Sequence, residues 1–119
     1  MSHSSTVDLT VRKALLFALV AEQLSVFYEQ GIWITESQGT SLAGRWLTEA
    51  KLVLPEGETR QFSALADQLA RQMADSLSRE AGLYAVHEMM EARGPRYESP
   101  FAQDIQAECE RQLVESKLV

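Results

Sequence analysis

The residues with the clearest potential for chemistry lie in one short segment, His87-Glu88-Met89-Met90-Glu91. If this segment is helical, His87 and Glu91 share one face at a spacing of four residues, where both could contact one cation. A zinc-protease helix needs two histidines at this spacing and a third ligand. The second histidine is missing here, and the chain's other one is His3. We therefore expect no metal and no cofactor, and His87 to be a partly buried histidine paired with a neighbouring carboxylate.

The single cysteine, Cys109, is the other reactive side chain. It falls at strict four-residue spacing with Phe101, Ile105 and Leu113, which predicts a packed apolar stripe and a buried, unreactive thiol. No nucleophile elbow is present, and the segment GTSLAG lacks the lysine and the spacing of a phosphate-binding loop. The sequence therefore predicts a protein that is not an enzyme. A small metal-dependent hydrolase using His87, Glu88 and Glu91 stays open as an alternative.

The composition restricts the partners. The 119 residues include 11 Lys and Arg against 17 Asp and Glu, for a net charge of -6. This balance argues against direct binding to nucleic acid or to anionic membranes, and Arg12-Lys13 is the only adjacent basic pair. A DNA-binding regulator using a helix over residues 42–54 is a further alternative. One cysteine fits a reducing compartment, so we expect a cytoplasmic protein.

The helix expected over residues 9–28 organises the chain, because it carries two apolar stripes instead of one. The first stripe consists of Leu9, Leu16, Val20 and Phe27, and the second of Val11, Leu15, Leu19 and Val26. Between the stripes lie Ala14, Ala18 and Ala21, which are small enough to let another helix approach closely. A signal peptide is a weaker interpretation of this segment. Its apolar run after Arg12-Lys13 spans only eight residues, and the amphipathic pattern continues to Tyr28.

Capping and turn residues divide the rest of the chain into helices. After a polar and mobile start at residues 1–6, Thr6 or Asp8 is expected to cap the first helix and Gly31 to end it. Helices are expected over residues 42–54, capped by Thr40 or Ser41, and over residues 58–79, with a break near residues 79–82. A fourth helix should end at residues 92–94, and Ser99-Pro100 should open the last one. The predicted fold is all-α, a single domain of four to five helices.

The two stripes and the neighbouring aromatic residues predict a surface for protein–protein contact. Both stripes cannot face one packing layer, so one stripe is expected to contact a partner, and self-association into a homo-oligomer is expected as well. Trp33 follows the end of the first helix, and Trp and Tyr often dominate binding energy. Trp33 is equally compatible with sealing the protein's own core, whereas Trp46 is expected to belong to the core. The expected partner-binding residues are Leu16, Val20, Phe27, Tyr28, Ile32, Trp33 and Ile34.

The short acidic chain, its five helical segments, and its over-apolar first helix followed by GIWITESQGTS resemble the QslA-type anti-activators of bacterial quorum sensing. The resemblance extends over the whole chain and includes no signature motif. It implies a protein that binds a LuxR-type transcription regulator and blocks its dimerisation, and thereby its binding to DNA. No site residue of that family can be assigned to a particular position here.

Overall fold

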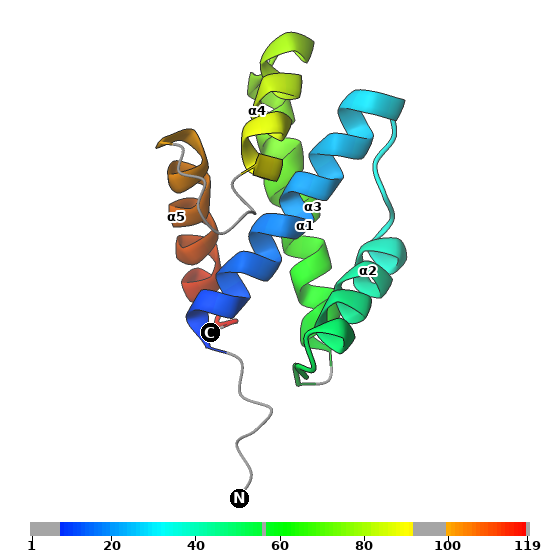
Figure 1. Ribbon diagram of the computed structural model, residues 1–119, viewed down its shortest axis with the longest axis vertical. Coiled ribbons are helices and arrows are strands. Elements are labelled where there is room, and N and C mark those ends of the chain that lie inside the picture. Colours follow the sequence, from blue (N-terminus) through cyan, green and yellow to red (C-terminus); the bar gives the residue numbers. More distant parts are fainter. Residues whose placement is uncertain (1–7, 56, 92–99, 119) are drawn as a thin grey trace, which may run out of the picture.

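The computed structural model describes residues 8–55, 57–91 and 100–118 of the chain (Figure 1). These ranges contain five helices and no β-strand, which confirms the predicted all-α bundle. The helices are α1 (Leu9–Gln30), α2 (Glu36–Glu49), α3 (Glu58–Ser76), α4 (Arg79–Glu91) and α5 (Pro100–Glu115). The expected mobile start at residues 1–6, the cap at Thr6, the helix end at residues 92–94 and the cap at Ser99 lie outside the described residues.

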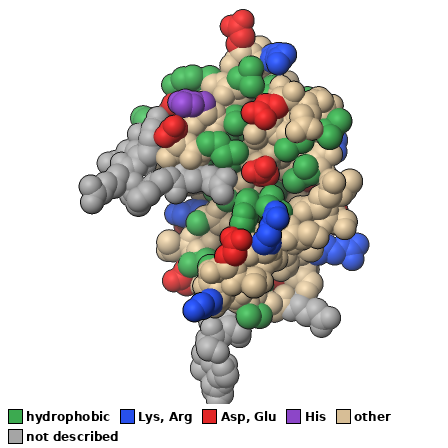
Figure 2. Space-filling view, turned by 45° about the vertical axis from the view of Figure 1, so that its right-hand side comes forward, with side chains coloured by type: hydrophobic (Ala, Val, Ile, Leu, Met, Phe, Trp, Pro, Cys, Tyr) green, Lys and Arg blue, Asp and Glu red, His purple; other side chains and the backbone are tan. Residues whose placement is uncertain are grey.

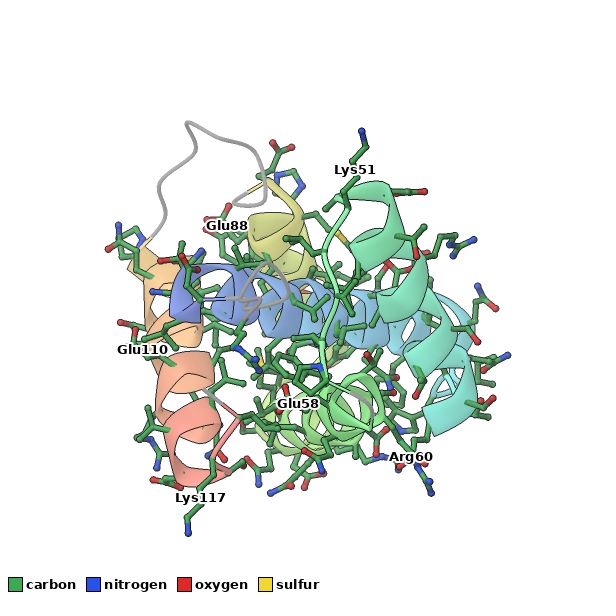
Figure 3. All side chains as sticks on the ribbon, turned by 90° about the horizontal axis from the view of Figure 1, so that it is seen from below. Lys51, Glu58, Arg60, Glu88, Glu110 and Lys117 are labelled. Atoms are coloured by element: carbon green, nitrogen blue, oxygen red, sulfur yellow. The ribbon has the colours of Figure 1, made fainter. Side chains whose placement is uncertain are left out.

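Helix α1 is the centre of the bundle. Its first turn is capped by Asp8, whose side chain accepts a hydrogen bond from the backbone N–H of Val11 at 3.0 Å. Gly31 closes the helix in the left-handed conformation, as predicted, at φ 75°. Seen from below, α1 lies on α3 with α5 on one side and α2 on the other, while α4 also packs against it (Figure 3).

The middle of both apolar stripes of α1 is covered by helices of the same chain, while Val11, at the start of the second stripe, is only partly buried. Leu16 and Val20 of the first stripe have no exposed surface, and Leu15 and Leu19 of the second are also buried. We expected one stripe to be left for another molecule because both stripes cannot face one packing layer. That reason was wrong. The helices surround α1 on several sides, so it is not packed against one layer only.

Helix α2 begins and ends earlier than predicted. Its N-cap is Thr35, not Thr40 or Ser41, because Thr35 and Gln38 exchange hydrogen bonds between side chain and backbone in a capping box. The helix ends at Glu49, not at residue 54. Lys51 adopts a left-handed conformation at φ 60°, and the backbone N–H of Leu52 returns to the carbonyl of Leu47 at 2.8 Å.

The break between α3 and α4 lies just before the predicted range of residues 79–82. Leu77 is extended, and the side chain of Ser78 accepts a hydrogen bond from the backbone N–H of Ala81 at 3.2 Å. Gly82 has a different role from the expected break, because it lets α4 approach α1. A Cβ atom at this position would lie 2.0 Å from a ring carbon of Tyr28.

A buried arginine joins the beginning and the end of the described chain. Arg12 of α1 is mostly buried, and its guanidinium donates to the carboxylate of Glu58 at 2.7 Å and to the backbone carbonyl of Leu118 at 2.8 Å. These bonds connect α1 to the first turn of α3 and to the segment after α5. Leu118 is itself buried in the core.

Candidate protein-interaction site

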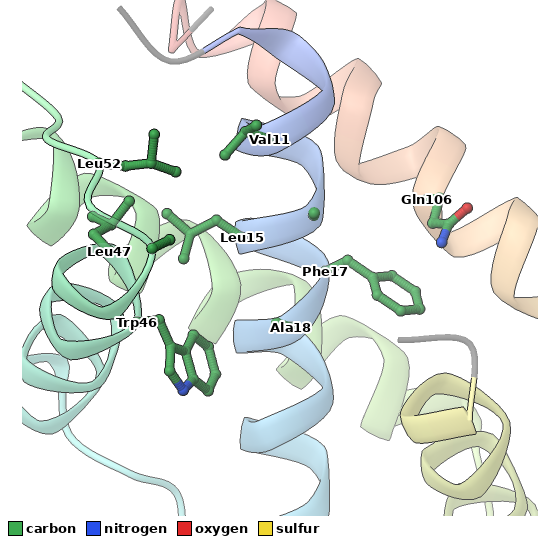
Figure 4. A pocket seen from close by; sticks show the side chains of 10 residues that line it. Val11, Leu15, Phe17, Ala18, Trp46, Leu47, Leu52 and Gln106 are labelled. Atoms are coloured by element: carbon green, nitrogen blue, oxygen red, sulfur yellow. The ribbon is translucent and has the colours of Figure 1, made fainter. Parts of the chain in front are cut away.

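An apolar groove runs along the N-terminal half of α1, between the C-terminal end of α2 and the side of α5 (Figure 4). We call it the α1 groove; its volume is about 350 Å³. Its floor includes Val11, Ala14 and Ala18, and its edges include Trp46, Leu52 and Gln106. Ala14 is exposed, so the backbone of α1 is open to close approach at this point.

The groove lies on the half of α1 that the described part of α4 does not cover. At a rise of about 1.5 Å per residue, the 13 residues of α4 span roughly 20 Å and the 22 residues of α1 roughly 33 Å. Gly82 of α4 contacts Tyr28 near the C-terminal end of α1, so α4 lies along that half of α1 (Figure 1). The groove residues of α1 all fall between Val11 and Ala18.

The sequence already marked part of this groove. Ala14 and Ala18 are two of the three small residues that were expected to permit a close helix approach, and both line it. Trp46, expected in the core, packs against the core and also forms an edge of the groove. The contribution of Leu52 was missed, because it depends on the turn that follows α2. Figure 2 shows hydrophobic side chains reaching the surface in patches among acidic and basic ones.

The second candidate feature is the aromatic corner at the end of α1, formed by Phe27, Tyr28 and Trp33. The rings of Phe27 and Trp33 stack with their centroids 4.2 Å apart and an angle of 9° between their planes. The guanidinium of Arg71 lies over the Trp33 ring, 4.8 Å from its centroid. The Tyr28 ring meets that of Phe27 edge-on at 5.1 Å.

A buried glutamine holds the same corner in place. The side-chain amide of Gln23 accepts a hydrogen bond from the backbone N–H of Ile34 at 3.2 Å and donates to its carbonyl at 3.3 Å. It also donates to Asp67 of α3 at 3.4 Å. Gln23 therefore satisfies the backbone of the loop between α1 and α2, and sequence reasoning did not identify it. The signal was a polar residue one turn after Leu19 on an apolar stripe.

The structure divides the seven predicted partner-binding residues into two groups. Leu16 and Val20 lie inside the bundle with no exposed surface, and Tyr28 is also buried. Phe27, Trp33 and Ile34 are partly exposed around the corner, and Ile32 is 55% exposed. Only the second group is accessible to a partner while the bundle stays closed. Contact of these residues with a partner stays a prediction.

The contacts of Trp33 favour a role in stability. We expect Trp33→Ala to lower the free energy of unfolding by about 2 kcal/mol, because it removes one ring from a stack and the platform under Arg71. Chemical denaturation measures this loss. Trp33→Phe is the matched control and should retain most of the stability because it keeps an aromatic ring. Unchanged stability in the alanine variant, together with loss of partner binding, would show that Trp33 is a binding residue instead.

Cys109 lies in the core, as predicted, with 1% of its surface exposed. Burial, and then the nearby carboxylate of Glu108, raise the pKa of the Cys109 thiol from 9.0 to about 12. The thiol is therefore protonated near neutral pH and is a poor nucleophile. Met89 is likewise fully buried.

The raised pKa of Cys109 makes stability sensitive to alkaline pH. The contribution of the buried thiol to the free energy of unfolding should be fully present below the unfolded-state pKa near 9. It should be lost progressively as the pH rises towards 12. From about pH 8 to about pH 10.5, wild type should lose roughly 1–2 kcal/mol more stability than Cys109→Ala. Urea denaturation of both proteins at the two pH values measures the difference. Parallel losses in the two proteins would contradict it.

His87 is exposed on α4, which corrects the expectation of partial burial. Leu77 is extended and ends α3, so His87 does not continue the apolar stripe of that helix. Within the described residues, no three His, Cys, Asp or Glu side chains gather closely enough to hold a metal ion. No helix in the same part of the chain is long and apolar enough to cross a membrane.

Comparison with known proteins adds no relative. No family model, no curated protein and no solved structure matches this chain.

Proposed function

We propose that this chain is a non-enzymatic protein-interaction module, and that it acts as an anti-activator by binding a LuxR-type quorum-sensing transcription regulator. The observation that carries the interaction part is the α1 groove, an open apolar surface on the central helix with an exposed floor residue, Ala14. Open apolar grooves with an aromatic residue at the edge are typical of protein-binding sites. The choice of partner rests on the resemblance to the QslA-type anti-activators.

The proposed mechanism is steric. A regulator that must dimerise to bind DNA needs a free apolar surface for its own dimer, and occupation of that surface by another protein blocks the step. The net charge of -6 makes direct competition for DNA by this chain unfavourable, so the effect should pass through the regulator. The proposal also includes self-association, which light scattering tests against the monomer mass of 13.3 kDa.

The test uses the purified full-length chain and the ligand-binding domain of a LuxR-type regulator. We expect a complex in isothermal titration calorimetry and a loss of regulator dimer in sedimentation velocity. Ala14→Lys places a charge on the groove floor and should weaken the complex by about tenfold or more. Ala64→Lys, at an exposed alanine of α3 outside the groove, is the control and should bind as wild type does.

The outcomes separate the parts of the proposal. A complex that forms equally well with both lysine variants would place the contact outside the α1 groove. The absence of any complex with LuxR-type regulators would overturn the anti-activator proposal.

A further inference from the structure

We propose that α5 is a detachable cover of the bundle, fastened to α1 by Arg12 and Lys13, and that it opens as a unit while α1 to α4 stay folded. Its release uncovers Val20, a residue of the first stripe that has no exposed surface in the closed bundle. The proposal concerns the free chain and goes beyond the proposed function, on which it does not rest.

A crevice of about 210 Å³ lies between α5 and α3. Met73 of α3 and Ile105 of α5 line its two sides. The buried residues Val20 of α1 and Cys109 of α5 also line it. Helix α5 therefore packs on α1 and α4 and leaves a gap on the side of α3. It can move away from α1 without disturbing the packing of α3 on α1.

Helices α2 and α4 are fixed more closely, each by a contact at a glycine. Gly39 of α2 lies against Ser63 of α3, where a Cβ atom would be 2.2 Å from the Ser63 Oγ. Gly82 of α4 lies in the same way against Tyr28 of α1. The buried side chains of α5 are Ala102, Cys109 and Leu113. An element that buries such a small set opens at a lower free energy than the whole protein.

Two polar contacts fasten α5 and the segment after it to α1, and both come from adjacent basic residues. Arg12 donates to the backbone carbonyl of Leu118 at 2.8 Å. Lys13 pairs at 3.3 Å with Glu110, which lies on the side of α1 that α5 covers (Figure 3). The two contacts therefore hold the C-terminal half of α5 against the beginning of α1.

Helix α5 also carries ion pairs of its own, which favour the helical form after it leaves α1. Arg111 pairs with Glu108 and with Glu115, one turn away on either side. Gln112 donates a further hydrogen bond to Glu108 at 2.9 Å. Pairs at spacings of three and four residues stabilise a helix without tertiary contacts. We therefore expect α5 to leave α1 as one unit.

Cys109 reports the opening, because it is the single cysteine of the chain and only 1% of its surface is exposed. Its reaction with a thiol reagent requires an opening of the structure. In the full-length chain, Cys109 should react about tenfold or more faster than the globally unfolded fraction allows. Urea denaturation followed by circular dichroism gives that fraction. The rate should rise with urea, but less steeply than global unfolding does, because less surface is exposed.

Leu113→Ala and Leu47→Ala are a matched pair that separates the opening of α5 from unfolding of the whole chain. Each leucine is buried near the end of its helix, and its carbonyl accepts from the N–H of the leucine five residues later. Both variants should lower global stability. Leu113→Ala should speed the labelling of Cys109 about tenfold or more, whereas Leu47→Ala in α2 should leave the rate within about twofold.

Lys13→Ala tests the attachment without removing a buried side chain, and so remains informative if Leu113→Ala does not fold. It should speed the labelling of Cys109 by about twofold or more, because the ion pair to Glu110 is lost. Arg60→Ala is the control, because it breaks an exposed pair between α3 and α2. This control should leave the labelling rate unchanged.

Four results would each overturn the proposal. Labelling of wild type at the rate that global unfolding allows, or acceleration by Leu47→Ala in proportion to its lost stability, would show that the bundle opens as a whole. A rate that urea does not change would show that the thiol reacts without release of α5. A rate that Lys13→Ala does not change would show that the basic pair does not fasten the cover.

Discussion

Leu16→Ala is expected to lower the free energy of unfolding by about 3–5 kcal/mol, because it removes a side chain with no exposed surface from the central helix. The loss combines two terms: the burial free energy of the methyl and methylene groups that are removed, and the cost of the cavity that remains. Helices pack against α1 on several sides, so no single one can move in to fill the space. Chemical denaturation monitored by circular dichroism measures the effect.

Leu83→Ala is the matched control for this prediction. Leu83 is the same residue type in a helix, but 37% of its surface is exposed, so the loss should be about 1 kcal/mol or less. Similar losses at both positions would contradict the central placement of α1. If Leu16 instead contacted a partner, Leu16→Ala would reduce affinity while leaving the stability of the free protein almost unchanged.

Arg12→Ala is expected to cost about 3 kcal/mol of stability, because it breaks a mostly buried ion pair from one side. The carboxylate of Glu58, whose side chain is 24% exposed, loses its cation, and the carbonyl of Leu118 loses a hydrogen bond of 2.8 Å. The change should also release the segment after α5 from α1. Hydrogen exchange of the Leu118 amide, which bonds to the carbonyl of Leu113, reports this release.

Arg60→Ala provides the control, since Arg60 pairs with Glu36 where both side chains are well exposed. That pair should contribute less than about 1 kcal/mol. The double variant Arg12→Ala/Glu58→Gln should recover part of the loss, because no uncompensated carboxylate remains. Equal losses for Arg12→Ala and Arg60→Ala would show that the Arg12 cluster contributes no more than a surface pair.

The parts of the fold that depend on local sequence could be predicted. The first helix, its cap at Asp8 and its end at Gly31 follow from short-range hydrogen bonding and apolar spacing. The stripe through Cys109 also follows from spacing within one helix. The predicted start of α2 was wrong, although the signal for it is local. Thr35 lies three residues before Gln38, which is the spacing of a capping box, but Thr40 and Ser41 were preferred as caps.

The parts that depend on contacts between distant segments could not be predicted in the same way. The spacing of residues on α1 shows that two stripes must be covered, but not whether helices of this chain or another molecule cover them. Arg12 lies one turn before Leu16 on the buried side, yet its partners are 46 and 106 residues away in the chain. The α1 groove likewise depends on how α2 and α5 pack on either side of α1.

The central position of α1 has a consequence for synthesis on the ribosome. Helix α1 is made before every helix that covers it, and Leu118 follows Arg12 by 106 residues. At a synthesis rate of about 5–20 residues per second, roughly 5–20 s pass between the synthesis of Arg12 and that of Leu118. During that time the part of α1 that α5 covers stays exposed on the nascent chain. This protein should therefore depend on chaperones that hold nascent chains more than a bundle whose central helix is made last.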